Sequence, residues 1–537
     1  KIVLGKYLSK FMEYRQEIDG LRALAVLPVI LFHAGLESFQ GGFVGVDIFF
    51  VISGYLITSI ILKEKSQDQF TLLGFYERRA RRILPALFFV MFCCIPFAWV
   101  WMLPSDLKDF SLGIVTVTTF ISNILFWQQS GYFATDSDLV PILHTWSLAI
   151  EEQFYLFFPI LLLLIWKLGQ RAIFSLFITL IVLSLALAQW ASLNAPSANF
   201  YLIPTRGWEL LLGVVAAFYL FNKSSEIKLS LWIKNLLSSI GFLLIIYSIF
   251  IFNSSIPFPS LYTLFPTVGT ILIILFASKE TFLAQFLSVR PLVLLGLISY
   301  SAYLWHYPIF SFAKLSLLYE MNSPFFMFLS IISFCLAYLS WRYVEKPFRD
   351  REKMSRKKVF TYLGTLGFLL VFLGSVGYMN NGFEGRFNIP DELVHSFSFH
   401  NLREKCDEKS SSMLDKDFCL IGEISSSTKV AVFGDSHSDA LLPAFNKAAR
   451  EQGVGVVHLG LGGCPPLIGV YVKRGIYPEG TCYDLSNKQL NYVKTNKIKK
   501  VFLVSRWAQY TDGDYSRTSG TFYYLSLNKG GNLSKAI

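Results

Sequence analysis

Twelve long apolar segments fill the chain up to about residue 380, and they limit its possible folds more than any other feature. Each has nearly the length of a helix that crosses a bilayer. With 53% hydrophobic residues and a mean hydropathy of +0.48, the 537-residue chain is too apolar for a soluble protein of its size. We therefore predict a polytopic α-helical membrane bundle. The segments cover approximately residues 21–39, 44–62, 83–103, 110–128, 148–166, 171–193, 205–221, 232–252, 260–278, 292–313, 325–343 and 359–379.

Clusters of Lys and Arg in two loops, 63–82 and 344–358, predict that both loops face the cytoplasm. Twelve full crossings would place these loops on opposite sides of the membrane, so one segment between them must fail to cross. We select segment 110–128, which is rich in Ser and Thr and precedes a loop without Lys or Arg. A re-entrant or interfacial segment there leaves about ten bundle helices and one linking helix, 359–379. The linking helix would deliver the C-terminal region to the outside.

The cysteines give independent evidence on the compartment of the C-terminal region. Four of the seven lie there, at positions 406, 419, 464 and 482, and an even number of cysteines fits disulfides in an oxidising compartment. Three pairings are possible, and short loops favour 406–419 and 464–482. The alternative is a cytosolic domain with four free thiols.

The C-terminal region changes character near residue 428. Residues 381–427 are polar and aperiodic, whereas apolar runs at Lys429–Phe433, Val454–Leu459 and Val501–Ser505 predict strands that alternate with helices near 439–451 and 485–496. Such alternation is typical of a parallel sheet. We expect four parts: a transmembrane domain at 1–350, an additional transmembrane helix at 351–380, a linker at 381–427 and an α/β domain at 428–537.

Ionisable residues inside the apolar segments are the candidate site of the membrane part, because such groups are costly in a bilayer and tend to be functional. Arg15, Asp19, Arg22 and His33 share one face of the first helix. The arginines at its inner end suit a phosphorylated donor, since guanidinium groups bind phosphate bidentately. The other candidates for this role are the loop residues Arg78, Arg79, Arg81 and Arg82, for which orientation of the loop in the membrane is the alternative explanation.

A second set of titratable residues is expected in the outer half of the bundle. His33 can act as a general base or as an acyl carrier, and Asp47 enters the next helix at a similar depth and can orient the imidazole. Glu151 is a weaker candidate, because a carboxylate also favours a helix N-terminus electrostatically. His144 and His306 are further candidates. For every lone histidine the alternative is a structural role.

Six motifs occur in the order RQEIDGLRALAVLPVILFH, GGFVGVDIFFVISGYLI, ERRARRILP, HTWSLAIEEQFYLFFP, SYSAYLWHYPI and WRYVEKPFR. Together they resemble the acyltransferase-3 family of integral membrane acyltransferases over residues 13–350. The resemblance implies ten transmembrane helices and acetyl-CoA as the donor, bound from the cytoplasm. The family's Arg-x-x-x-Asp motif falls on Arg15 and Asp19, and its Arg-x10-His motif falls on Arg22 and His33. Its paired loop arginines fall within residues 78–82.

The sequence KVAVFGDSHSDALLPAF places Ser436 on a sharp turn from strand to helix, where a helix N-cap is the structural alternative. With GLGGCPP downstream, it resembles the SGNH-hydrolase domains fused to acyltransferase-3 proteins. The resemblance implies that Ser436 is a nucleophile, with its own N–H and that of Gly463 in the oxyanion hole. The family's oxyanion Asn is not evident at Arg506, and no histidine follows His458 to complete an Asp-x-x-His pair. We therefore expect that residue 537 is not the natural end of the domain.

These features predict an inner-membrane O-acetyltransferase with a periplasmic SGNH-like α/β domain. The resemblance implies that acetyl-CoA donates an acetyl group to a surface polysaccharide such as the O-antigen of lipopolysaccharide. We expect no metal, and no nucleic-acid partner despite the net charge of +11, because membrane orientation explains most of the basic residues. A membrane transporter of an acyl or polar substrate and an esterase that removes acetyl groups from glycans are the alternatives.

Overall fold

The computed structural model describes residues 14–130, 137–222, 229–253, 255–316, 323–387, 406, 418–473, 480–507 and 524–527. The chain divides into two compact units, 1–386 and 387–537, and each is described by itself.

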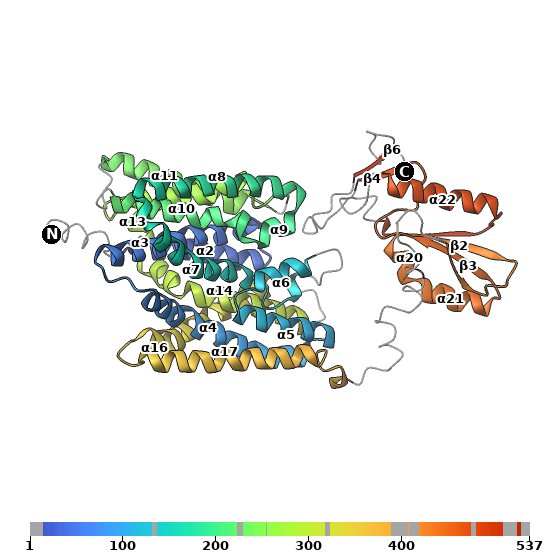
Figure 1. Cartoon of the computed structure of the whole chain (residues 1–537), viewed down its shortest axis with the longest axis horizontal. Coiled ribbons are helices and arrows are strands. Elements are labelled where there is room, and N and C mark those ends of the chain that lie inside the picture. The colour runs from blue at the N-terminus through green and yellow to red at the C-terminus, as the bar shows by residue number, and fades with distance from the viewer. Residues whose placement is uncertain are drawn as a thin grey trace. The chain divides into compact units, whose positions relative to one another are not determined.

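The first unit is a bundle of helices that lie side by side (Figure 1). Among the helices that the structure describes, eight are long and apolar enough to cross a membrane: α3, α4, α7, α8, α11, α14, α15 and α17. The helices α2, α10 and α12 also pack among these eight; α2 carries Glu17, Asp19 and Arg22 among its 18 residues, and α12 has only 13 residues. The helices of the unit are α2 (Gln16–His33), α3 (Gly45–Ser66), α4 (Leu72–Trp101), α5 (Pro104–Thr118), α6 (Ser122–Gln129), α7 (Thr145–Ile165), α8 (Gln170–Asn194), α9 (Pro196–Tyr201), α10 (Ile203–Asn222), α11 (Leu231–Ile251), α12 (Leu264–Phe276), α13 (Phe282–Leu287), α14 (Arg290–Ser316), α15 (Ser323–Ser340), a π-helical turn (Trp341–Glu345), α16 (Lys346–Arg349) and α17 (Arg356–Met379).

Glycines let the helices around the centre of the bundle approach closely. A Cβ atom on Gly54 of α3 would lie 1.9 Å from the carbonyl oxygen of Leu210 in α10, and one on Gly213 would lie 2.1 Å from that of Val51. The same kind of contact joins α14 to α2, where a Cβ on Gly296 would lie 1.9 Å from the carbonyl oxygen of Asp19. Close backbone approach at small residues is how helices associate in lipid, where the hydrophobic effect does not drive them together.

The segment predicted not to cross the membrane is a hairpin of two short helices, α5 and α6. Gly382, beyond the outer end of α17, contacts Pro104 at the start of α5, whereas Gly367, near the middle of α17, contacts Thr118 at the end of α5. The chain therefore enters only about half of the depth of α17 before it turns back at Phe120. Gln153 of α7 stabilises that turn, because its side-chain amide donates to the carbonyl of Phe120 at 2.7 Å.

The helix α17 belongs to the membrane unit, which extends to Arg386. Its small residues Gly374 and Gly377 lie against Ser111 of α5. Ser355 caps its start by accepting from the backbone N–H of Lys358.

The second unit is built on a four-stranded sheet with the order β1-β3-β2-β5, in which β2, β3 and β5 are parallel and β1 is antiparallel to β3. The helices α21 and α22 lie on opposite faces of the sheet (Figure 1). Their apolar side chains pack against it in two separate clusters. The elements are β1 (Cys419–Gly422), β2 (Lys429–Gly434), α20 (Ser436–Ala440), α21 (Leu442–Glu451), β3 (Gly455–Gly460), β4 (Val470–Lys473), α22 (Thr481–Thr495), β5 (Val501–Val504) and β6 (Tyr524–Leu527).

The predicted strands and the parallel sheet are confirmed, with two differences. The helix expected near 439–451 is two helices, because Pro443 occupies the first turn of α21. Residues Cys419–Gly422, in the stretch expected as a linker, form β1 and pair with β3. Both predicted disulfides are confirmed, since Cys406 is bonded to Cys419 and Cys464 to Cys482.

Candidate active site

The membrane unit contains a cavity lined by side chains from α2, α3, α4, α7 and α14. Three arginines, Arg22, Arg79 and Arg82, line its wall, together with the carboxylates Glu151 and Glu152. Such a lining combines concentrated positive charge with a largely apolar body formed by residues such as Phe49 and Leu148. A phosphorylated molecule with an apolar arm fits this combination.

Asp19 holds one of these arginines in place. Its carboxylate accepts from Arg22 at 3.3 Å and from the hydroxyl of Tyr14 at 2.6 Å. Because Arg22 and Asp19 are three residues apart on α2, both lie on the same face of that helix. The shared helix face predicted for these residues thus lets Asp19 orient Arg22, whereas Asp19 itself does not line the cavity.

Arg15 serves the packing of the bundle instead. Its guanidinium donates to Glu17 at 2.7 Å and to the hydroxyl of Tyr55 at 3.0 Å. Two further bonds go to the carbonyls of Ile274 and Ala277 at the end of α12. Those carbonyls have no partner within their own helix, so Arg15 caps α12. The expectation that Arg15 lies with Arg22 at the donor site is not met, since Arg15 does not line the cavity.

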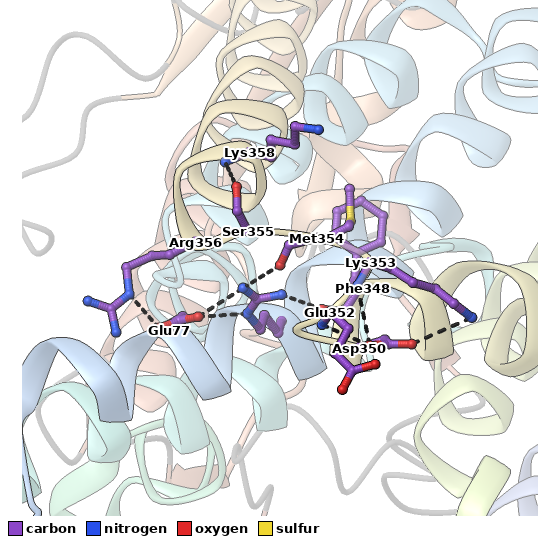
Figure 2. A network of polar contacts seen from close by, with 10 residues as sticks. Glu77, Phe348, Asp350, Glu352, Lys353, Met354, Ser355, Arg356 and Lys358 are labelled. Carbon is purple, nitrogen blue, oxygen red and sulfur yellow. Dashed lines mark hydrogen bonds and ion pairs between the residues drawn. The ribbon is translucent and has the colours of Figure 1, made fainter.

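Arg81 is likewise engaged, on the face of α4 that points away from the cavity. Its guanidinium pairs with the buried carboxylate of Glu77 at 2.9 Å and donates to the carbonyls of Phe348 and Met354, both at 2.9 Å. Glu77 also accepts from Arg356 at 2.6 Å, and Figure 2 shows these two side chains facing each other. This network fastens the start of α17 and the preceding loop to α4.

The loop before α17, which belongs to this network, is also held by a hydrogen bond within itself. The backbone N–H of Glu352 donates to the carboxylate of Asp350 at 3.0 Å, a bond that lowers the pKa of Asp350 (Figure 2).

Arg78 belongs neither to the cavity lining nor to the network around Arg81, because it pairs with Glu64 of α3 at 2.7 Å. Of the four predicted loop arginines, two line the cavity and two form ion pairs within the protein.

Glu151 lies deeper in the bundle than predicted. It lines the cavity with the arginines, and its carboxylate accepts from Ser53 at 3.0 Å and from Tyr155 at 2.9 Å. The reason for the difference is that α7 follows the returning hairpin of α5 and α6, so that Glu151 lies well below the outer end of the bundle.

Three histidines gather at the other end of α2, together with two tyrosines of α14. The ring of His33 lies 5.2 Å from that of His306 and 5.0 Å from that of Tyr307, measured between centroids. His144 completes the group, 5.6 Å from His306. We call His33, His144 and His306 the histidine cluster.

The local geometry of His33 leaves one ring nitrogen for chemistry. Its Nδ1 lies 2.9 Å from the carbonyl oxygen of Val29, one turn earlier in α2. A carbonyl only accepts, so Nδ1 carries the hydrogen and Nε2 carries the lone pair. A histidine in this tautomer can take a proton at Nε2 or attack a carbonyl carbon with it.

Asp47 does not orient His33, which corrects the expectation from sequence. Its buried carboxylate pairs with Arg206 of α10 at 3.0 Å, and Arg206 also lies 3.3 Å from Glu209. The guanidinium of Arg206 stacks near the rings of Phe50 and Trp146, each 5.3 Å away. This triad ties α3 to α10. Arg206 and Glu209 are a pair of ionisable residues within the apolar segment 205–221. That pattern was the available signal in the sequence, and the predicted site did not include it.

The sequence interpretation also missed Ser147 and Tyr303, which lie between the cavity and the histidine cluster. The Ser147 Oγ atom is 2.7 Å from the hydroxyl oxygen of Tyr303. Both residues occur inside the motifs that contain His144 and His306. Hydroxyl groups carry no charge that stands out in an apolar segment, so spacing relative to those histidines was the available signal.

In the second unit, Ser436 lies at the carboxyl ends of the parallel strands. It starts α20 directly after β2, and Asp435 caps the turn by accepting from the backbone N–H of His437 at 2.9 Å. The other carboxylate oxygen of Asp435 accepts from the backbone N–H of Arg506 at 3.0 Å, after β5. A Cβ on Gly434 would lie 1.7 Å from the carbonyl oxygen of Val504, so this sharp turn needs glycine.

Gly463 follows β3 on the same edge of the sheet. Its φ of 76° lies in the left-handed region that favours glycine. The N–H of Leu461 donates to the carbonyl of Gly434, which brings this turn beside the end of β2 and Ser436. The two predicted residues are therefore on neighbouring turns.

A buried serine, histidine and aspartate lie next to this edge, but their contacts differ from those of a catalytic triad. Ser438 Oγ lies 3.0 Å and Asp439 Oδ1 lies 3.4 Å from the same atom, Nε2 of His458. In a catalytic triad the serine and the carboxylate contact different ring nitrogens. Within the described residues no histidine hydrogen-bonds the hydroxyl of Ser436.

Comparison with known proteins agrees with both halves of this description. The model of the acyltransferase domain matches residues 15–342, and the model of the SGNH domain that is fused to such acyltransferase domains matches residues 405–533. No solved structure matches the chain.

Three relatives represent the similar proteins. O-acetyltransferase OatA of Staphylococcus aureus is 32% identical over 393 residues, which cover 69% of this chain and 64% of the relative. Peptidoglycan O-acetyltransferase OatA of Listeria monocytogenes is 34% identical over 369 residues, 65% and 58% of the two chains. The putative peptidoglycan O-acetyltransferase YrhL of Bacillus subtilis is 36% identical over 368 residues, 65% and 57% of the two chains.

The chain thus spans about three fifths of the length of the curated relatives it matches. The chain is a multi-pass membrane protein that belongs to the acyltransferase family and carries a fused SGNH domain.

Proposed function

We propose that the protein transfers an acetyl group from cytoplasmic acetyl-CoA to a hydroxyl group of a polysaccharide on the other side of the membrane. The observation that carries this proposal is a polar path along α2. Arg22 lines a cavity with Arg79 and Arg82, and His33 lies in the histidine cluster three turns further along the same helix, about 16 Å away by helical rise.

The donor side rests on charge and shape. The guanidinium groups of Arg22, Arg79 and Arg82 bind the phosphates of CoA, since planar guanidinium matches phosphate oxygens. The apolar part of the cavity holds the pantetheine arm and presents the thioester toward the histidine cluster. Within the described part of the chain Arg82 forms no ion pair, which leaves its charge for a ligand.

The transfer step uses His33 Nε2. As a general base it takes the proton of an attacking hydroxyl while that oxygen bonds to the acetyl carbon. The C–S bond then breaks, and the departing CoA thiolate takes the proton from the imidazolium. As an acyl carrier, Nε2 attacks the carbonyl carbon itself, the C–S bond breaks, and CoA leaves as the thiol with the proton of Nδ1. An acceptor hydroxyl then attacks the same carbon, the N–C bond breaks, and the hydroxyl proton returns to the imidazole.

The soluble unit acts on the acceptor side. The hydroxyl of Ser436 accepts the acetyl group as an ester and transfers it to a sugar hydroxyl, or the domain selects the sugar for direct transfer. The two disulfides support an oxidising compartment for this unit, such as the bacterial periplasm outside the inner membrane.

The acceptor is a cell-envelope polysaccharide. The sequence interpretation favours an O-antigen-like chain, whereas the names of the Listeria and Bacillus relatives favour peptidoglycan as a second candidate. Both are glycans with free hydroxyls beyond the membrane, so the same chemistry serves either.

The test is O-acetylation of both polysaccharides in membranes supplied with labelled acetyl-CoA. His33→Ala and Arg22→Met should abolish incorporation, and Arg171→Met, at an exposed position far from the cavity lining, is the matched control. Full incorporation by membranes that contain His33→Ala would refute the proposal. A transporter would not need acetyl-CoA, and an esterase would need Ser436 but neither Arg22 nor His33.

A further inference from the structure

Tyr303 of α14 is the side chain that the cavity and the histidine cluster share. It lines the cavity, and its ring lies 5.3 Å from His144 and 5.4 Å from His306 between centroids. Among the described residues, none of the three clustered histidines lines the cavity. An acyl group that moves from the cavity toward His33 must therefore pass Tyr303.

Two hydrogen bonds hold the Tyr303 hydroxyl in this position. It donates to the carbonyl of His144 at 3.0 Å, and its oxygen lies 2.7 Å from Ser147 Oγ. A phenol has a single hydrogen, so Ser147 donates to Tyr303 when Tyr303 donates to His144. Both partners stand at the start of α7, and the pair of bonds thus ties α14 to α7 across this end of the cavity.

A third side chain packs against this hydrogen-bonded pair, and we call Tyr303, Ser147 and Phe49 together the wall of the cavity. Phe49 of α3 lines the cavity beside Tyr303, with ring centroids 6.5 Å apart. Tyr303 is only 7% exposed, so its side chain is packed tightly at this end of the cavity. Tyr303 therefore stands between the cavity that it lines and the histidines that its ring contacts.

We propose that Tyr303 is a positioning residue that closes the outer end of the donor cavity and limits hydrolysis of the acetyl thioester. This inference rests on the proposed use of acetyl-CoA. Bound CoA fills the inner part of the cavity, and the closed wall keeps water of the outer side from the thioester. When the wall opens without an acceptor, water attacks the acetyl carbon, the C–S bond breaks, and acetate and the CoA thiol leave, the thiol with a proton from water.

The test measures acetate release from acetyl-CoA by the full chain in proteoliposomes without a sugar acceptor. Each neutral hydrogen bond that holds the wall shifts its opening equilibrium by about fivefold. We expect release to rise about fivefold in Ser147→Ala and about 25-fold in Tyr303→Phe, which loses both bonds and keeps the ring. Tyr76→Phe is the matched control, because Tyr76 donates to the carbonyl of Leu156 at 2.8 Å and does not line the cavity.

A second measurement reports on the wall without acetyl-CoA. Leu148 lines the cavity, so Leu148→Cys can be labelled from the outer side by a small membrane-impermeant thiol reagent only when the wall is open. In a background with alanine at the three free cysteines 93, 94 and 335, labelling should be slow, and Ser147→Ala should accelerate it about fivefold.

The two measurements separate the failure of this inference from the failure of the proposed function. Unchanged acetate release and unchanged labelling in variants that melt like the wild type would overturn the role of Tyr303. If no variant and no wild-type protein uses acetyl-CoA, but Ser147→Ala accelerates labelling, the wall exists and the proposed donor is wrong.

Discussion

Two neighbouring arginines of α4 should respond in opposite ways to the same substitution. Arg81 and Arg82 carry the same charge, but the guanidinium of Arg81 is hydrogen-bonded within the protein, whereas Arg82 lines the cavity. Replacement by Met keeps most of the apolar stem and removes the guanidinium in both cases. The comparison therefore isolates what each charge does.

The cost at Arg81 follows from its partners. Arg81→Met leaves the carboxylate of Glu77, 3% exposed, with Arg356 as its remaining cation, and it leaves the carbonyls of Phe348 and Met354 without their donor. Breaking a buried ion pair costs about 3–5 kcal/mol. Arg356 is half exposed and still reaches Glu77, so we expect about 3 kcal/mol, the lower end of this range.

The cost at Arg82 falls on the ligand instead. A hydrogen bond to a charged group contributes about 1.5–3 kcal/mol, so Arg82→Met should weaken the binding of CoA about 10- to 150-fold. Its removal also relieves repulsion from Arg22 and Arg79 around the cavity, and the melting temperature should stay the same or rise.

The assay pairs binding of radiolabelled CoA with thermal unfolding of the purified protein in detergent. Arg81→Met should melt several degrees earlier and, below its melting point, lose less CoA affinity than Arg82→Met. The reverse pattern, with stable Arg81→Met that binds CoA poorly and unstable Arg82→Met that binds it well, would refute the assignment of the two side chains.

Three further substitutions probe the packing that holds the site. Arg206→Met leaves the carboxylate of Asp47 buried without its cation, so thermal unfolding should show a loss of about 3–5 kcal/mol, and a wild-type melting curve would contradict the buried triad. Gly54→Ala forces a Cβ to within 1.9 Å of a carbonyl oxygen of α10, and the resulting overpacking should cost about 1–3 kcal/mol or more in the same assay. Replacing Cys464 and Cys482 by Ser opens a bridge between residues 18 positions apart and should destabilise the soluble unit by about 3 kcal/mol; reduction of the wild type should destabilise it at least as much, because reduction also opens Cys406–Cys419, and no change on reduction would count against the bridges.

Much of the architecture could be predicted because it follows from local pattern. The apolar segments are as long as a bilayer is thick, and the basic loops on one side require that one segment fails to cross. That segment is the hairpin of α5 and α6. The pairing Cys464–Cys482 also followed from short separation, since nearby cysteines close the shortest loop.

The site was only partly predictable, because its partners come from distant helices. Asp47 and His33 stand at a similar depth in adjacent helices, which made a contact plausible, but Arg206 of α10 takes the carboxylate. Glu151 moved inward because the hairpin of α5 and α6 shifts the start of α7, and a pattern of apolar residues does not record such a shift.

By itself, the sequence determined which residues share a helix face and where along each apolar segment the charges gather, since 3.6-residue periodicity and the cost of charge in lipid act locally. It thereby identified α2 as the helix that joins Arg22 to His33. Only the tertiary structure decided which arginine lines an open cavity and which pairs within the protein, as at Arg82 and Arg81. The physical reason is that a guanidinium has the same chemistry at every position, and its role depends on whether the neighbouring helix offers it a carboxylate or an open cavity.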